Sequence, residues 1–264
     1  MPRPRLKPEP QATAYTSRSA AIIIDDIGYD LQIVKELACI PAPIAYAILP
    51  HTLHAVEAAN ILHAAGKEIL LHLPMEPHSH PDESPGPGAL MADMDEGEIR
   101  RLIRKNLAAV PFVSGVNNHM GSRFMENEAR LVPVMEELRA RGLFFVDSMT
   151  TDNSRGRESA GRVRVRFAAR DIFIDYAPGH AVAMESLLSA FRLGSKNGAP
   201  VLMIGHPYRE TVRAIRDVLP LWRKEGVKVI PVSAYLRISG GTKKQDPLVK
   251  ECRTMNPPLK EGDR

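Results

Sequence analysis

Residues 21–28 of the chain read AIIIDDIG, an apolar run that ends on two adjacent carboxylates. Consecutive isoleucines are typical of a β-strand buried on both faces, as in a parallel sheet covered by helices. Aspartates directly after such a strand are typical of a site at the strand's carboxyl end. This stretch therefore predicts a parallel α/β fold whose chemistry begins at Asp25 and Asp26.

The same pattern, an apolar run that ends on a polar or ionisable residue, occurs six more times in the chain. The runs are 44–49 before His51, 69–71 before His72, 113–116 before Asn117, Asn118 and His119, 143–146 before Asp147 and Ser148, 172–174 before Asp175, and 201–204 before Gly205 and His206. Helical patterns separate them, and in a closed barrel such strand ends converge at one mouth. We predict an α/β fold, a distorted (β/α) barrel of about seven strands in a single domain. An open doubly wound sheet is the alternative, but its ligands would gather at one switch point.

Composition assigns this domain to residues 19–238. Residues 1–18 are Pro-rich and predict a flexible linker, and residues 239–264 predict a disordered tail. The first twenty residues contain neither a secretory signal nor a transmembrane span. The net charge is only +4, and part of it lies at the two ends, so we expect no nucleic-acid partner. The cysteines, Cys39 and Cys252, do not form a zinc-binding spacing.

Asp25 and Asp26 have a functional and a structural interpretation. In the functional interpretation, one carboxylate binds a cation while its neighbour acts as a base. The structural alternative is a helix N-cap, which would explain one aspartate but not two. His72 and His119 offer two imidazoles at the same mouth, and with Asp26 they form a normal open ligand set for zinc-type catalysis.

His206 follows the seventh apolar run, and its imidazole could serve as a general acid near neutral pH. The alternative is a solvent-exposed loop histidine. Four further residues are candidates for metal or substrate contacts: Glu76, Asn118, Arg123 and Asp147.

Five segments, IIIDDIG, LLHLPMEP, GVNNHMGSRF, FFVDSMT and MIGHP, occur in this order and together resemble the divergent polysaccharide deacetylase family. That family is a branch of the NodB-type carbohydrate esterases within the glycoside hydrolase/deacetylase superfamily. The resemblance covers residues 21–236. It implies a distorted (β/α) barrel, a divalent metal such as Zn²⁺, a glycan substrate, and hydrolytic removal of N- or O-acetyl groups. It also suggests a periplasmic or cell-envelope location.

Residue by residue, the resemblance assigns Asp25 as base, Asp26 as metal ligand, His72 as first metal histidine and His206 as the late catalytic histidine. The family's second metal histidine stands four residues after the first, where this chain has Glu76. The family's Arg-x-Pro-Tyr motif is replaced by NNHMGSR. We therefore predict Asp26, His72 and His119 as ligands, with Glu76 as the substitute if His119 lies too far away.

These departures keep two other functions open. The chain could be a catalytically weak or inactive carbohydrate-binding barrel, or a metal-dependent phosphoesterase that uses the same Asp/His set.

Overall fold

The computed structural model describes residues 18–197 and 199–239. The predicted linker and tail therefore lie outside the described residues, except for Arg18 and Ser239. The strands are β1 (Ser19–Ile27), β2 (Ala45–Ile48), β3 (Glu68–Met75), β4 (Val113–Met120), β5 (Phe144–Asp147), β6 (Phe167–Ala169), β7 (Ile172–Phe173), β8 (Val201–Gly205) and β9 (Lys228–Val229). The helices are α1 (Leu31–Ala38), α2 (Ala55–Ala64), α3 (Glu96–Ala109), α4 (Glu128–Ala140), α5 (Gly156–Val163), α6 (His180–Asn197), α7 (Arg209–Lys224) and α8 (Val232–Ile238).

All nine strands belong to one sheet, in the order β6-β5-β4-β3-β2-β1-β8-β7, with β9 paired to β1. Every strand pairing is parallel. The order is cyclic, because β1 stands between β2 and β8 just as it would in a closed barrel. The ring is open between β6 and β7, the two ends of the order. This arrangement confirms the distorted (β/α) barrel in a single domain, and it has no switch point of the doubly wound kind.

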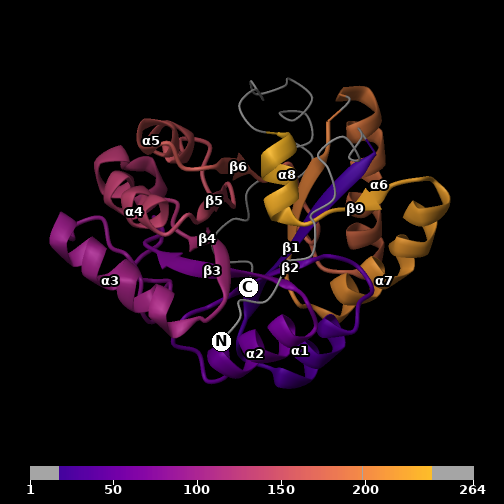
Figure 1. Ribbon diagram of the computed structural model, residues 1–264, viewed down its shortest axis with the longest axis horizontal. Coiled ribbons are helices and arrows are strands. Elements are labelled where there is room, and N and C mark those ends of the chain that lie inside the picture. Colours follow the sequence, from indigo (N-terminus) through magenta and orange to yellow (C-terminus); the bar gives the residue numbers. More distant parts are fainter. Residues whose placement is uncertain (1–17, 198, 240–264) are drawn as a thin grey trace, which may run out of the picture.

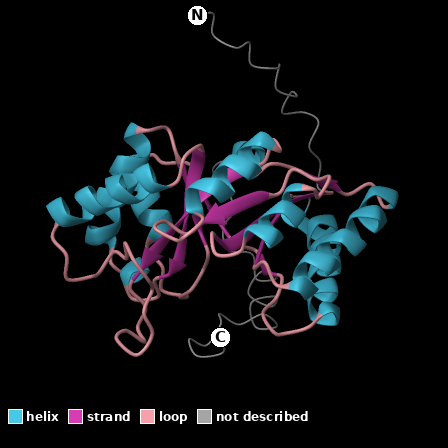
Figure 2. Cartoon of the chain, turned by 90° about the horizontal axis from the view of Figure 1, so that it is seen from below, coloured by secondary structure: helices cyan, strands magenta, loops and turns pink. Residues whose placement is uncertain are grey.

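The two faces of each strand contribute to different cores. On β1, Ile22 and Ile24 face the outer helices, whereas Ala21 and Ile23 face the barrel interior. Both sets are fully buried, which explains why the run is apolar without alternation. Figure 2 shows the strands in the centre of the molecule with helices on both flanks.

The barrel interior is closed by α8. Tyr235 and Leu236 of this helix belong to the same buried cluster as the inward residues of the strands, and Figure 1 places α8 between β5 and β9. The site must therefore lie elsewhere on the barrel, at the carboxyl ends of the strands. Among the described helices, none is both long enough and apolar enough to cross a lipid bilayer.

The structure differs from the expected elements in several places. The strand expected before Asp175 is the two-residue strand β7, and a further short strand that was not predicted, β6, precedes it. Two helices were not predicted by the sequence pattern either, namely α5 and α8. Strand β4 continues past Asn117 to Met120, because β3 also extends to Met75 and the two strands remain paired to their ends.

Candidate metal centre and its neighbours

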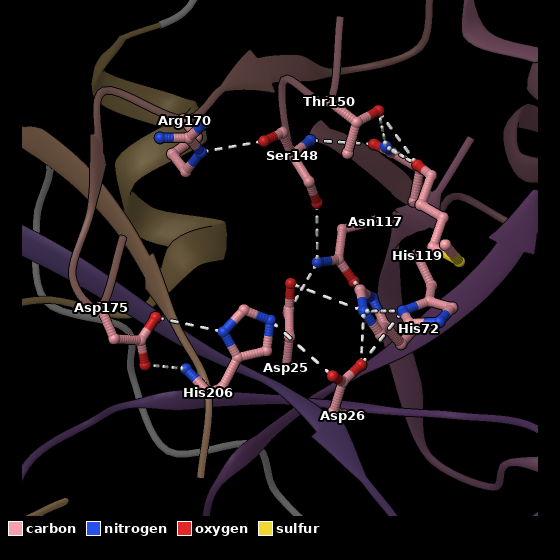
Figure 3. A network of polar contacts seen from close by, with 12 residues as sticks. Asp25, Asp26, His72, Asn117, His119, Ser148, Thr150, Arg170, Asp175 and His206 are labelled. Atoms are coloured by element: carbon pink, nitrogen blue, oxygen red, sulfur yellow. Dashed lines mark hydrogen bonds and ion pairs between the residues drawn. The ribbon is translucent and has the colours of Figure 1, made fainter. Parts of the chain in front are cut away.

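The alternation of the strands brings the candidate residues together. Ile23, Leu70, Phe173 and Ile204 all face the barrel interior. Two residues further along each chain segment stand Asp25, His72, Asp175 and His206. Since residues i and i+2 of a strand point to the same face, the inward face of each strand leads directly into a site residue. All four side chains are buried at the mouth of the barrel (Figure 3).

Asp26 would point outward by this rule, but a break in the strand turns it inward. The register of β1 against β2 shifts between Ile24 and Ile27, as in a β-bulge. Asp26 has φ of 56°, in the left-handed region that aspartate tolerates better than most residues. The bulge therefore allows two adjacent carboxylates to face the same mouth. Neither of them caps α1, whose N-cap is Asp30.

Asp26, His72 and His119 present three ligand atoms to one point. Asp26 Oδ1 lies 3.3 Å from His72 Nε2 and 3.1 Å from His119 Nδ1, and the two nitrogens are 3.2 Å apart. Ligand atoms held about 2.0–2.1 Å from a tetrahedral Zn²⁺ are separated by about 3.3 Å. The spacing and the donor types thus fit a zinc-like ion with a position left open. Because this centre includes His119 from β4, it does not need Glu76 as a substitute ligand.

Asn117 fixes the chemistry of this cluster. Its Nδ2 donates to Asp25 Oδ1 at 2.8 Å, and a carboxylate can only accept, so the amide oxygen must face the other way. That oxygen lies 3.0 Å from His72 Nδ1, which must therefore carry the proton. In neutral His72 the lone pair is then on Nε2, facing the Asp26 oxygen. Burial would lower the pKa of His72, but the neighbouring carboxylates of Asp25 and Asp26 raise it, so either a proton on Nε2 or a metal ion can separate the two lone pairs.

The adjacent carboxyl groups have opposite electrostatic environments. Burial raises the pKa of Asp25 above its usual range, and the nearby charges of His72 and His206 offset only part of the effect. Burial would raise the pKa of Asp26 too. Hydrogen bonds with His119 and His72 outweigh it and hold the pKa of Asp26 well below its usual range. Groups with pKa values displaced in opposite directions are suited to separate acid–base and binding roles.

His206 is oriented by Asp175. One carboxylate oxygen of Asp175 lies 3.1 Å from His206 Nδ1, and the other accepts from the His206 backbone N–H at 2.7 Å and the Thr211 hydroxyl at 2.8 Å. His206 Nε2 is directed toward Asp26 Oδ2, at 3.8 Å (Figure 3). Burial would lower the pKa of His206, but the bond to Asp175 outweighs it and raises this pKa. The structure thus places His206 inside the site, and not on an exposed loop.

Glu76 and Arg123 lie beside the centre and bind each other. Glu76 is buried and accepts from Arg123 Nη1 at 2.9 Å and from the backbone N–H of Ala92 at 2.6 Å. Both carboxylate oxygens are therefore engaged, one with the long loop between β3 and α3 and the other with the segment after β4.

Asn118 and Asp147 face away from the cluster. Asn118 binds the backbone of Met120 and Ser148, and Asp147 accepts from the Met149 backbone N–H and the Ser154 hydroxyl. The inward partners at these strand ends are Asn117 and Ser148, which bind each other at 3.3 Å. Sequence reasoning did not select Asn117, Ser148 or Asp175 as site residues. The signal was present for two of them, because Ser148 and Asp175 each stand two residues after an inward apolar residue, Val146 and Phe173.

The fold and this cluster define an α/β barrel with a candidate metal centre at the carboxyl ends of its strands. The chain belongs to the divergent polysaccharide deacetylase family, which it matches over residues 22–236. It is 36% identical over 200 residues to the protein YibQ of Escherichia coli, a match that covers 75% of this chain and 61% of that protein. The chain therefore spans about three fifths of the length of that relative. Over 236 residues it is 28% identical to a Haemophilus influenzae protein, covering 84% of this chain and 82% of the relative.

Solved structures share the fold. The Agrobacterium tumefaciens protein ATU2773 superposes with a TM-score of 0.78 at 23% identity, covering 84% of this chain and 90% of that one. A mutant of the CE4-family pseudoenzyme BA3943, described as having restored enzymatic activity, has a TM-score of 0.50 at 15% identity. That match covers 84% of this chain and 68% of the other.

Proposed function

We propose that the protein is a metal-dependent deacetylase that hydrolyses acetyl groups on a polysaccharide or related glycan. The observation that carries this proposal is the convergence of Asp26, His72 and His119, with Asp25 on one side and His206 on the other. Family membership supports acetylated glycan as the substrate class. The geometry supports a hydrolytic reaction in which proton transfers are divided between two residues.

Asp26, His72 and His119 would hold a divalent ion of the Zn²⁺ type. When bound, such an ion polarises a carbonyl group and makes water more acidic. Asn117 holds His72 in the tautomer that presents Nε2 to the ion, the role that a partner of the other ring nitrogen plays in many metal sites. In this chain His119, from β4, supplies the second imidazole where the family pattern has a histidine at the position of Glu76.

Asp25 and His206 divide the proton transfers. Asp25 accepts a proton from the attacking water while the water oxygen forms a bond to the acetyl carbonyl carbon. The bond between that carbon and the sugar nitrogen or oxygen then breaks, and the leaving atom takes a proton from His206. Acetate and a free amine or hydroxyl are the products. The Asp175 carboxylate stabilises the protonated form of His206, which is the form that must donate.

The proposal is tested by metal analysis and an acetate assay on the same protein. Wild type should contain or titrate to about one divalent ion per chain. It should release acetate from acetylated glycans, lose this activity to a chelator and regain it with Zn²⁺. A protein that binds the ion stoichiometrically but releases phosphate from phosphomonoesters and no acetate would be a phosphoesterase. A protein that binds acetylated glycan without metal and without turnover would be a binding barrel.

A further inference from the structure

A pocket of about 460 Å³ opens beside the candidate metal centre, beyond the adjacent ends of β1 and β8. Asp26 and His206 form part of its wall, so it opens directly on the reacting groups. The rest of the wall comes from the loop between β1 and α1, from α1 itself, and from the segment between β8 and α7. Its volume lies in the range of pockets that bind small molecules.

Two tyrosines line this pocket and expose much of their side chains. Tyr29 is 64% exposed and Tyr208 is 48% exposed, whereas Tyr46 and Tyr235 are buried. Within the described part of the chain, the tyrosines that rank as strongly exposed are these two, and both lie at this pocket. An exposed aromatic side chain alone means little, but two at the wall of one pocket indicate a binding surface.

The loop that carries Tyr29 is held in place. Gly28 has φ of 133°, and a Cβ atom there would lie 2.1 Å from Thr52 Oγ1, so residue 28 must be glycine. The Gly28 carbonyl accepts from the His54 backbone N–H at 3.0 Å. On the other side, Asp30 caps α1 by accepting from the Gln32 backbone N–H at 2.7 Å. Both neighbours are anchored, so Tyr29 is held facing outward.

Tyr208 lies against the candidate catalytic histidine. Its ring centroid lies 5.5 Å from that of His206, tilted by 37°. Its backbone carbonyl accepts from Val212 at the start of α7. Polar side chains share the pocket wall with the two rings, namely Gln32, Glu36 and Arg209. Aromatic faces beside hydroxyl-binding polar groups are the combination that recognises pyranose rings, whose C–H faces are apolar and whose edges are polar.

We propose that this pocket is a glycan subsite in which Tyr29 and Tyr208 stack against sugar rings next to the acetylated residue. The proposal rests on the proposed deacetylase function for the identity of the ligand. It names the substrate class as an oligosaccharide of several rings, in which binding beyond the acetylated sugar positions the acetyl group between Asp25 and His206.

The test measures binding of N-acetylglucosamine oligomers of one to four rings by calorimetry. The full chain carries Asp25→Asn so that the probe is not consumed. We expect Kd to decrease as rings are added. Tyr208→Ala and Tyr29→Ala should each weaken binding of the tetramer about tenfold. Tyr208→Phe keeps the aromatic ring and should bind the tetramer as tightly as the Asp25→Asn protein without a tyrosine substitution. Phe112→Ala removes another aromatic ring, 49% exposed and stacked on His63 at the opposite end of β4, and should change nothing.

Equal tetramer affinities in the tyrosine variants and the Phe112→Ala control would overturn the subsite. The same conclusion would follow if no oligomer bound to the Asp25→Asn protein. Melting temperatures of all variants are compared, and the substituted side chains are exposed, so folding should be retained. Acetate release by wild type is measured in parallel. Its absence would count against the deacetylase proposal alone, because the affinity comparison needs no turnover.

Discussion

Two clusters in this molecule surround a carboxylate with basic side chains, arginines in one and histidines in the other. On the outer helices, Glu137 of α4 is buried. Its Oε1 forms an ion pair with Arg104 Nη2 at 2.6 Å, and its Oε2 forms one with Arg141 Nη1 at 2.6 Å. At the barrel mouth, Asp26 Oδ1 lies 3.3 Å from His72 Nε2 and 3.1 Å from His119 Nδ1. The helix cluster is complete, because each carboxylate oxygen already has a cation. In the mouth cluster, three ligand atoms converge on one point and could hold a metal ion.

A stabilising ion pair and a functional cluster differ in the partners that surround the carboxylate. Hydrogen bonds from Arg104, the strongest influence, and from Arg141 lower the pKa of Glu137 to about 2. The pKa of Asp26 is also held low, but its partners are two histidines, and the other ring nitrogen of His72 binds Asn117. Matched charges make a structural network, whereas several acceptors aimed at one point make a binding site.

The largest effect is expected from removing the carboxylate of the mouth cluster. Asp26→Ala deletes one of three ligands, so the bound divalent ion should fall from about one per chain to near zero, and acetate release should be abolished. Metal analysis after gel filtration measures this. Glu76→Gln is the matched control and should retain the ion, since the oxygens of Glu76 hold Arg123 and Ala92. If Asp26→Ala kept its metal, β1 would contribute no ligand.

Asp25→Asn tests whether the two adjacent carboxylates have different roles. The variant keeps the shape of the side chain but cannot accept a proton, so turnover should fall about 10²- to 10⁴-fold. Metal content and melting temperature should stay close to those of wild type. A variant that lost its fold and its metal together would instead show that Asp25 has a structural role.

Asn117→Asp separates the two bonds of the bridging amide. An aspartate still accepts from His72 Nδ1 but loses the amide N–H that Asp25 accepts from, and two carboxyl groups at this distance raise each other's pKa and share a proton. We expect turnover to fall about 10- to 100-fold while metal affinity changes much less.

Asn106→Asp is the control for that substitution. Asn106 is equally buried, and it also bridges a histidine, His51, and an acceptor, the Gly88 carbonyl. This variant should be destabilised without any selective loss of turnover. Equal losses of turnover in the two variants would argue against a specific role for Asn117.

The smallest effect is expected in the complete cluster. Glu137→Gln should lower the free energy of unfolding at pH 7 by about 1 kcal/mol and leave metal binding unchanged. Because the folded-state pKa of Glu137, about 2, lies below its ordinary value of 4.5, its contribution is present above pH 4.5 and is lost as the pH falls toward 2. Urea unfolding at pH values between 4.5 and 2 should show the free energies of unfolding of wild type and Glu137→Gln converge.

The control for Glu137 is Glu128→Gln. Glu128 is partly exposed and pairs with Arg162 at 3.5 Å, so this substitution should cost much less. A constant difference between wild type and Glu137→Gln at every pH would mean that packing, and not charge, explains the loss.

Much of the fold followed from local patterns. The buried isoleucines of β1 were recognisable, because a strand buried on both faces leaves an unbroken apolar run. Strand β6 and the helices α5 and α8 were not predicted from the sequence. Three- and two-residue strands carry too little periodicity to be distinguished, and their pairing depends on β5 and β8.

Sequence by itself determined that this protein is a parallel barrel with acids, amides and histidines at the ends of its strands, since strand burial and strand ends are local properties of the chain. Only the tertiary structure decided which of them meet. It selected Asn117 over Asn118, because neighbouring residues of a strand point to opposite faces. It turned Asp26 inward, because a bulge reverses that alternation at one residue. It brought Asp175 to His206, because β7 and β8 are neighbours in the sheet although 31 residues separate the two side chains.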